Sequence, residues 1–344
     1  MIGHHPYTAV MLVPTGIGAS VGGYAGDALP IARTLAAAVD RLITHPNVLN
    51  GASAFWPIPN ALYVEGFGLD RFCQGNLQLR PTRANRVGVV FDCAIEPDLR
   101  LRHDHAIQAA RATLGLDVAI AVESDRPFGV ELTTFASGAS GGSLTAPDAL
   151  LQAAKKALAK GAEALAIVAR FPDDIEADDY VQGRGVDPVA GLEAILSHLV
   201  AREFGVPCAH APAIRLDSTP VRVSDRAAAE EIGFTFLPCV LAGLSRAPQW
   251  IPNERSTPAD ISASEVDVAI APATAFGSPA LLALNDRTPA PLFVAIRENT
   301  SVMQVAPEQV NIPAIYVSSY LEAIGLVTAH RAGIALDAVM PVFP

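Results

Sequence analysis

The chain has 344 residues, of which 51% are hydrophobic and 17% charged, and its formal net charge is −11. This length and apolar content predict two or three domains with sizeable cores. The acidic balance, with its basic residues dispersed, argues against a nucleic-acid partner, since binding phosphates requires clustered Lys and Arg.

Runs rich in β-forming residues alternate with helix-like runs, which is typical of an α/β protein with mostly parallel sheets and flanking helices. The predicted strands are Thr8–Val13, Ala61–Glu65, Arg86–Asp92, Val118–Glu123, Ala164–Arg170, Phe234–Leu237, Val266–Ala271 and Leu292–Ile296. The predicted helices are Leu29–Asp40, His105–Leu114, Pro147–Ala159, Val189–Arg202, Ala227–Ile232 and Tyr320–Ala329.

Three loops combine hydroxyl side chains with glycine, each after an apolar run and before a helix-like segment. Glycine lets backbone N–H groups approach a ligand closely, so each loop is suited to hold an anion or a carbonyl oxygen. We predict substrate-binding residues in the outer loops and a nucleophile or oxyanion donor in the middle one. These residues are Thr15, Gly16, Gly18 and Ser20 in the first loop, Ser137 and Ser140 in the second, and Thr274 and Ser278 in the third.

The spacing of these loops suggests a pseudo-threefold of three similar α/β units, at residues 1–116, 117–240 and 241–344. The alternative is that an α/β protein simply repeats strand–glycine–helix turns. The first loop departs from the dinucleotide fingerprint by one position, so it indicates a generic anion site rather than a NAD site. No cofactor is therefore assigned.

A polar cluster follows the strand-like segment Leu42–Ile43. Ligands of open α/β sheets bind outside the carboxyl ends of the strands, so His45 is placed to act as a general acid or base. Asn47 or Asn50 would orient an amide or a carboxylate. The alternative is an Asn-rich turn that caps itself.

The four cysteines are too sparse for a disulfide framework or a zinc ribbon, and the N-terminal segment does not resemble a secretory signal. No apolar run reaches the 18 residues of a membrane span. We therefore expect a reduced, cytoplasmic protein with no membrane partner, in the form of a monomer or a homo-oligomer.

Lysine occurs only at positions 155, 156 and 160, within one predicted amphipathic helix, where it belongs to a solvated stripe. A Schiff-base lysine or a Ser–Lys dyad therefore has almost no candidate. Positive charge at a site must come from arginine, which suits planar carboxylate or amide-like groups.

The acidic stretch 172–185 looks like a long mobile loop or lid. Its paired acids are suited to bind a divalent metal ion through their carboxylate oxygens. The alternative is that the loop is simply solvated. A second metal hypothesis involves His198, Cys208 and His210. The same region offers Cys208 or Cys239 as a thiolate activated by a nearby imidazole.

Arg297, Glu298 and Asn299 directly follow the predicted strand Leu292–Ile296. A guanidinium, a carboxylate and an amide at one strand end suit recognition of a small polar molecule. A salt-bridged loop is the alternative.

Several motifs together resemble a bacterial and cyanobacterial family catalogued as a domain of unknown function, over nearly the whole chain. They are Pro14–Gly18, Gly22–Asp27, Thr44–Gly51, Val168–Asp174 and Leu244–Pro248. In plan, three units with central serine loops are also similar to cyanuric acid hydrolase and barbiturase, in which lysine assists serine in opening cyclic amides. Ser140 matches their serine element, but their lysine partners have no counterpart here.

We therefore expect an enzyme that acts on a small polar or anionic metabolite, with hydrolysis of a cyclic amide-type C–N bond as the leading reaction. One alternative is a cofactor-independent racemase or isomerase that uses Cys93 and Cys239 as opposed residues. The other is a noncatalytic protein that binds a carboxylate or phosphate with the same loops.

Overall fold

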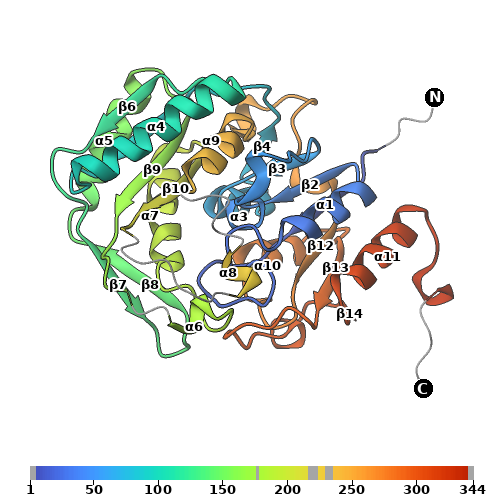
Figure 1. The fold of residues 1–344 in the computed structure, drawn as a ribbon. Coiled ribbons are helices and arrows are strands. Elements are labelled where there is room, and N and C mark those ends of the chain that lie inside the picture. The colour runs from blue at the N-terminus through green and yellow to red at the C-terminus, as the bar shows by residue number, and fades with distance from the viewer. Residues whose placement is uncertain (1–4, 176–177, 216–223, 229–234, 340–344) are drawn as a thin grey trace.

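The computed structural model describes residues 5–175, 178–215, 224–228 and 235–339. The strands form two parallel sheets that lie side by side (Figure 1). The larger sheet has the order β14-β13-β12-β1-β2-β3. Its strands are β1 (Thr8–Met11), β2 (Arg41–Thr44), β3 (Ala61–Tyr63), β12 (Val266–Pro272), β13 (Leu292–Ile296) and β14 (Ala314–Val317).

The two faces of the larger sheet are covered by different helix pairs, because alternate side chains of each strand point to opposite faces. On β1, Met11 packs into one core with helices α1 (Leu29–Ala38) and α11 (Tyr320–Arg331), whereas Val10 packs into another core with α3 (Gly66–Cys73) and α10 (Pro279–Asn285). The strands are therefore buried on both sides, as their continuous apolar runs require.

The smaller sheet comes from the middle of the chain and has the order β10-β9-β5-β6. Its strands are β5 (Val87–Phe91), β6 (Ile120–Glu123), β9 (Ala164–Arg170) and β10 (Cys208–Ala213). The helices α4 (Pro97–Leu114) and α9 (Leu237–Ser245) pack together, and so do α5 (Pro147–Ala159) and α7 (Ala190–Phe204).

Two short antiparallel pairs and several short helices complete the described part. The pairs are β4 (Leu77–Arg80) with β11 (Gln249–Pro252), and β7 (Val130–Thr134) with β8 (Ser140–Leu144). The short helices are α2 (Pro46–Leu49), α6 (Asp178–Val181), α8 (Asp225–Ala228), η1 (Ala52–Ala54), η3 (Asn253–Arg255), η4 (Ala263–Glu265), η5 (Pro307–Val310) and η6 (Leu336–Ala338). Among the described residues, no helix combines the length and apolarity needed to cross a membrane.

The predicted α/β class with mostly parallel sheets is confirmed, and Ala164–Arg170, Leu292–Ile296 and Pro147–Ala159 have the predicted bounds. The loop spacing, however, does not produce three similar sheets. Strands from both ends of the chain join one sheet, since β1 pairs with β12, and boundaries at 116 and 240 do not follow the sheets.

Two further predictions need correction. The strand predicted at 234–237 overlaps the start of α9, whose Pro238 is at a helix N-terminus, a position that proline favours. The loop predicted at Ser137–Gly142 is partly a strand, because Ser140 begins β8 of a hairpin, and the helix predicted after it, α5, begins at Pro147 once that strand has ended. Of the helix predicted at 227–232, only residues 227 and 228 are described, in α8, and 229–232 lie outside the described residues, as does residue 234.

Candidate functional site

The order of strands in the larger sheet reverses between β1 and β12. From β1 the chain proceeds to β2 and β3 on one side, and from β12 it proceeds to β13 and β14 on the other. Ligands of open parallel sheets bind outside the carboxyl ends of the strands at such a switch point. The loops after β1 and β12 therefore lie where a ligand is expected to bind.

The loop after β1 leaves a run of backbone donors unpaired. Gly16 and Gly18 have φ angles of +73° and +61°, in the left-handed region that favours glycine. Within the described residues, the N–H groups of the five successive residues 15–19 donate to no acceptor. Main-chain N–H groups in a turn with alternating handedness form a concave nest, which is suited to an anion.

His45 holds the beginning of this loop from the adjacent strand end. Its Nε2 accepts a 2.9 Å hydrogen bond from the N–H of Val13, so the neutral ring carries its hydrogen on Nδ1. Burial lowers the pKa of His45 to about 4. The contact that the structure shows for His45 therefore holds the start of the loop, and its acid–base role stays a prediction.

Asn299 holds the other end of the loop. Its Oδ1 accepts from the N–H of Val21 at 3.0 Å, and its Nδ2 donates to the carbonyl of Val21 at 2.9 Å and to the hydroxyl of Tyr320 at 2.8 Å. The N–H of Ser20 donates to the carbonyl of Thr300 at 2.8 Å. The loops after β1 and β13 are thus joined, and the amide of Asn299 is used within the fold.

The loop after β12 belongs to the same cluster. Thr274 Oγ1 lies 2.9 Å from Ser301 Oγ, and the N–H of Val302 donates to the carbonyl of Ile17 at 3.0 Å. The first and third polar loops are therefore linked through the segment that follows β13.

The middle polar loop also reaches the first one, through Ser140. Its N–H donates to the carbonyl of Gly16 at 2.9 Å, and its Oγ accepts from the N–H of Gly191 at 3.1 Å. A Cβ at Gly16 would lie 2.8 Å from that Oγ, so the buried hydroxyl is directly beside the loop. Ser137 is exposed in the hairpin turn, where its Oγ accepts from the N–H of Ala139.

Part of the acidic stretch 172–185 covers the first loop. The ring of Tyr180 on α6 stacks on Tyr24 with centroids 4.2 Å apart, and the Tyr24 hydroxyl donates to the carbonyl of Tyr180 at 2.7 Å. A Cβ at Gly18 would lie 2.8 Å from the carbonyl oxygen of Gly185. Residues 176 and 177 of this stretch lie outside the described residues.

Arg226 on α8 completes the cover. Its guanidinium donates to the carboxylate of Asp27 at 2.8 Å and to the carbonyl of Ala19 at 3.0 Å, and it lies 4.3 Å from the centroid of the Tyr24 ring. Figure 1 shows α6 and α8 beside the loop that follows β1. We call Tyr24, Asp27, Tyr180 and Arg226 the clasp. Sequence reasoning missed it, because its members are scattered over 200 residues of the chain without a common pattern.

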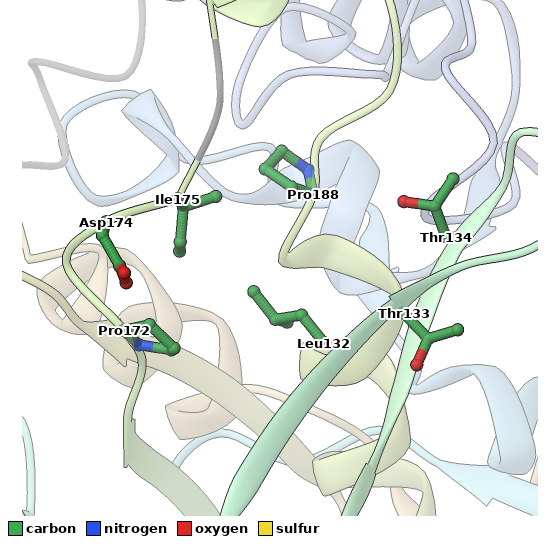
Figure 2. A pocket seen from close by; sticks show the side chains of 7 residues that line it. All are labelled: Leu132, Thr133, Thr134, Pro172, Asp174, Ile175 and Pro188. Atoms are coloured by element: carbon green, nitrogen blue, oxygen red, sulfur yellow. The ribbon is translucent and has the colours of Figure 1, made fainter.

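A pocket of about 280 Å³ lies further out, between the hairpin and the acidic stretch. Figure 2 shows Leu132 in the middle, facing Pro172, Ile175 and Pro188. Asp174 contributes a carboxylate to the lining. This pocket is open and mostly apolar, so it extends the covered region without adding a second anion site.

The other predicted binding residues already have partners in the fold. Asn47 Nδ2 donates to the carbonyl of Gly22 at 2.5 Å, and Asn50 Oδ1 accepts from the hydroxyl of Tyr63 at 2.9 Å. Ser278 caps α10 by accepting from the N–H of Leu281 at 3.3 Å, and Glu298 accepts from the N–H of Tyr320 at 2.7 Å.

Arg297 is exposed at the end of β13, where its guanidinium lies 4.5 Å from the centroid of the Tyr316 ring.

Of the two cysteines in the predicted racemase pair, Cys239 is buried and Cys93 is half-buried. Cys239 lies in α9 and donates its Sγ–H to the carbonyl of Gly51, and burial raises the pKa of this thiol. Cys93 follows β5 in the other sheet, where its N–H donates to Ser124 Oγ at 3.0 Å. A racemase pair requires two facing thiols, one of them ionised, and the environment of Cys239 favours the protonated form.

The predicted metal ligands are engaged separately. His198 Nδ1 lies 3.6 Å from a Glu65 oxygen, His210 Nδ1 lies 3.0 Å from Ser197 Oγ, and burial raises the pKa of Cys208 well above its usual value. Within the residues that the structure describes, no group of three or more His, Cys, Asp or Glu side chains could hold a metal ion. The metal hypothesis for His198, Cys208 and His210 is therefore corrected.

The comparisons with known proteins cover almost the whole chain. A family model described as "Protein of unknown function (DUF3326)" matches residues 8–340. An uncharacterized lipoprotein of Synechococcus sp. is 52% identical over 337 residues, which are 97% of this chain and 93% of the relative.

The name of that relative contradicts the predicted cytoplasmic location. A lipoprotein carries covalent lipid that holds it at a membrane. Cysteine count and hydropathy, on which the cytoplasmic prediction depended, do not report such an attachment, so the prediction was wrong.

Proposed function

The chain belongs to the DUF3326 family, and from its own geometry we propose that it is a binding protein for a small molecule with a carboxylate or phosphate group, held by residues 15–19. The single observation that carries this proposal is the run of five N–H groups at the switch point of the larger sheet that find no acceptor in the described part of the chain. An anion at this position satisfies several buried donors at once, whereas unpaired buried donors cost free energy.

The clasp supports the proposal because it encloses the same loop. A ligand held between the loop and the acidic stretch is shielded from water, which strengthens hydrogen bonds to its charge. Opening of the Tyr24–Tyr180 stack and of the Asp27–Arg226 pair would admit the ligand.

Amide-resolved NMR titration tests the proposal on the wild-type chain. Phosphate, acetate and a dicarboxylate are added separately at constant ionic strength. We expect the largest shift changes, saturating with concentration, in the amides of residues 15–19. Saturating shifts confined to another part of the chain, or no saturation with any of the anions, would contradict it.

Hydrolysis of a cyclic amide-type C–N bond is the second candidate. The observation in its favour is that the hydroxyl of Ser140 lies beside Gly16, so a nucleophile and an anion-stabilising loop are neighbours. Product formation from a panel of cyclic amides, abolished in Ser140→Ala, is the test. Its failure leaves the anion-binding proposal intact.

We also place the protein at a membrane, by analogy with the relative named a lipoprotein. Cell fractionation with detection of the native chain tests this placement, and recovery only in the fraction of free proteins would reject it.

A further inference from the structure

A second cavity, of about 230 Å³, lies between segments next to the larger sheet and segments next to the smaller sheet. The loop around η1 forms one wall, the end of α4 forms another, and the last turn of α9 forms the third. Representative lining residues are Leu49, Ile58, Tyr63, Leu114, Gly243 and Arg246. None of these residues belongs to the loop of residues 15–19 or to the clasp.

The walls of this cavity are apolar and closely packed. Leu49 and Tyr63 are buried, and the hydroxyl of Tyr63 already donates to Asn50 Oδ1 at 2.9 Å. A Cβ at Gly243 would lie 2.5 Å from the Tyr63 ring, so glycine lets α9 approach this wall. The cavity therefore has a fixed apolar shape that suits a hydrocarbon chain or an aromatic ring.

The only arginine among the lining residues, Arg246, brings a positive charge to this apolar cavity. It is exposed at the end of α9 and forms no ion pair among the described residues. Arg170, at the end of β9, is by contrast paired with Glu96 and Asp173. A guanidinium without an acidic partner is free to bind a carboxylate through two parallel hydrogen bonds.

Two exposed aromatic side chains come directly after η1 in the sequence, and η1 forms one wall of the cavity. Phe55 and Trp56 are 68% and 64% exposed, and they stand between the lining residues Ala54 and Pro57. The guanidinium of Arg33 lies 3.1 Å from the centroid of the Trp56 ring. Exposed aromatics next to an apolar cavity are typical of a ligand-binding site.

We propose that this cavity binds a small amphipathic carboxylate, with its apolar body against Leu49, Ile58 and Tyr63 and its carboxylate on Arg246. Pockets for drug-sized ligands occupy about 300–1,000 Å³. A cavity of about 230 Å³ therefore selects a smaller molecule, such as a medium-chain acyl or single-ring carboxylate.

Calorimetric titration with octanoate and with phenylacetate tests the proposal. We expect binding of at least one of them by the wild-type chain and about a tenfold loss of affinity in Arg246→Ala, which corresponds to about 1.4 kcal/mol. Octanamide, which lacks the charge, should bind wild type and Arg246→Ala equally. The charge-matched control is Arg255→Ala, which removes an exposed arginine on η3 and should bind like wild type.

A second variant tests the apolar part. Ala242→Phe places a ring in the cavity and should abolish octanoate binding, while its thermal unfolding reports whether the chain still folds. Absence of binding by the wild-type chain at millimolar concentrations overturns the proposal. Equal carboxylate affinities of Arg246→Ala and Arg255→Ala overturn it as well. Both variants leave residues 15–19 unchanged.

Discussion

His45 accepts a 2.9 Å hydrogen bond at Nε2 from the backbone N–H of Val13, across the ends of two neighbouring strands. The bond fixes the point at which the loop of residues 15–19 leaves β1. It also requires a neutral ring, which makes the loop sensitive to pH.

Stability should fall in acid through His45. Burial lowers its pKa to about 4, below the value of about 6.5 in an unfolded chain, so the unfolded state takes up the proton first. The stabilisation is fully present above pH 6.5 and is lost as the pH falls towards 4, by an amount on the order of 3 kcal/mol. Urea unfolding at pH 7.5 and 4.5 measures this difference in the free energy of unfolding.

The variant His45→Gln keeps an acceptor for Val13 but cannot titrate, so it should show a smaller loss of stability between those pH values. His105→Gln, which changes an exposed histidine on α4, should behave like wild type. An unchanged pH dependence in His45→Gln would show that other groups, such as the half-buried His210, whose pKa is also lowered, account for the whole effect.

Gly18→Ala should weaken anion binding more than tenfold. The alanine must adopt a φ of +61°, and its Cβ would lie 2.8 Å from the carbonyl oxygen of Gly185. Gly115→Ala is the matched control, since this residue has a φ of +68° with no atom within 4 Å of a Cβ. Both variants should lose about 1 kcal/mol of stability from backbone strain, and only Gly18→Ala should lose phosphate affinity in calorimetry.

Arg226→Gln should loosen the cover over the loop. The change removes the ion pair with Asp27, a carboxylate only 9% exposed, and the bond to the Ala19 carbonyl. We expect amide hydrogen exchange of residues 178–186 to accelerate about tenfold, which corresponds to about 1.4 kcal/mol.

Arg184→Gln is the control for that prediction. Its ion pair with Asp179 is 71% and 77% exposed, and such surface pairs contribute little. Similar exchange rates in the two variants would mean that the Arg226 contacts do not hold the cover closed.

Ser140→Ala should cost about 1 kcal/mol of stability, because the N–H of Gly191 loses its acceptor. Phosphate affinity should stay within about twofold of wild type, since the N–H groups of residues 15–19 do not depend on this hydroxyl. Ser137→Ala, in the exposed hairpin turn, should change neither quantity in urea unfolding or calorimetry. A large loss of affinity in Ser140→Ala would assign its hydroxyl to the ligand instead.

Local pattern was enough to predict several of the strands and helices. The apolar run Ala164–Arg170 and the amphipathic run Pro147–Ala159 have the predicted bounds, because burial on both faces or on one stripe leaves a periodic signature. The glycines at 16 and 18 were likewise identifiable as a turn whose N–H groups are suited to a ligand. The hairpin at Ser140 was missed because glycine and serine resemble loop residues even when they are paired in a strand.

What the amino-acid sequence determined by itself was the α/β class and the presence of polar, glycine-bearing turns at strand ends, since both follow from contacts between residues close in the chain. The tertiary structure decided which of those turns meet and which side chains remain available. Asn299 reaches Val21 because strands from both ends of the chain enter one sheet, whereas Ser140 reaches Gly16 from the β7–β8 hairpin and Arg226 reaches Asp27 from α8. Such contacts join residues far apart in the chain, which no local periodicity encodes, and they engage several of the predicted ligand-binding side chains within the fold.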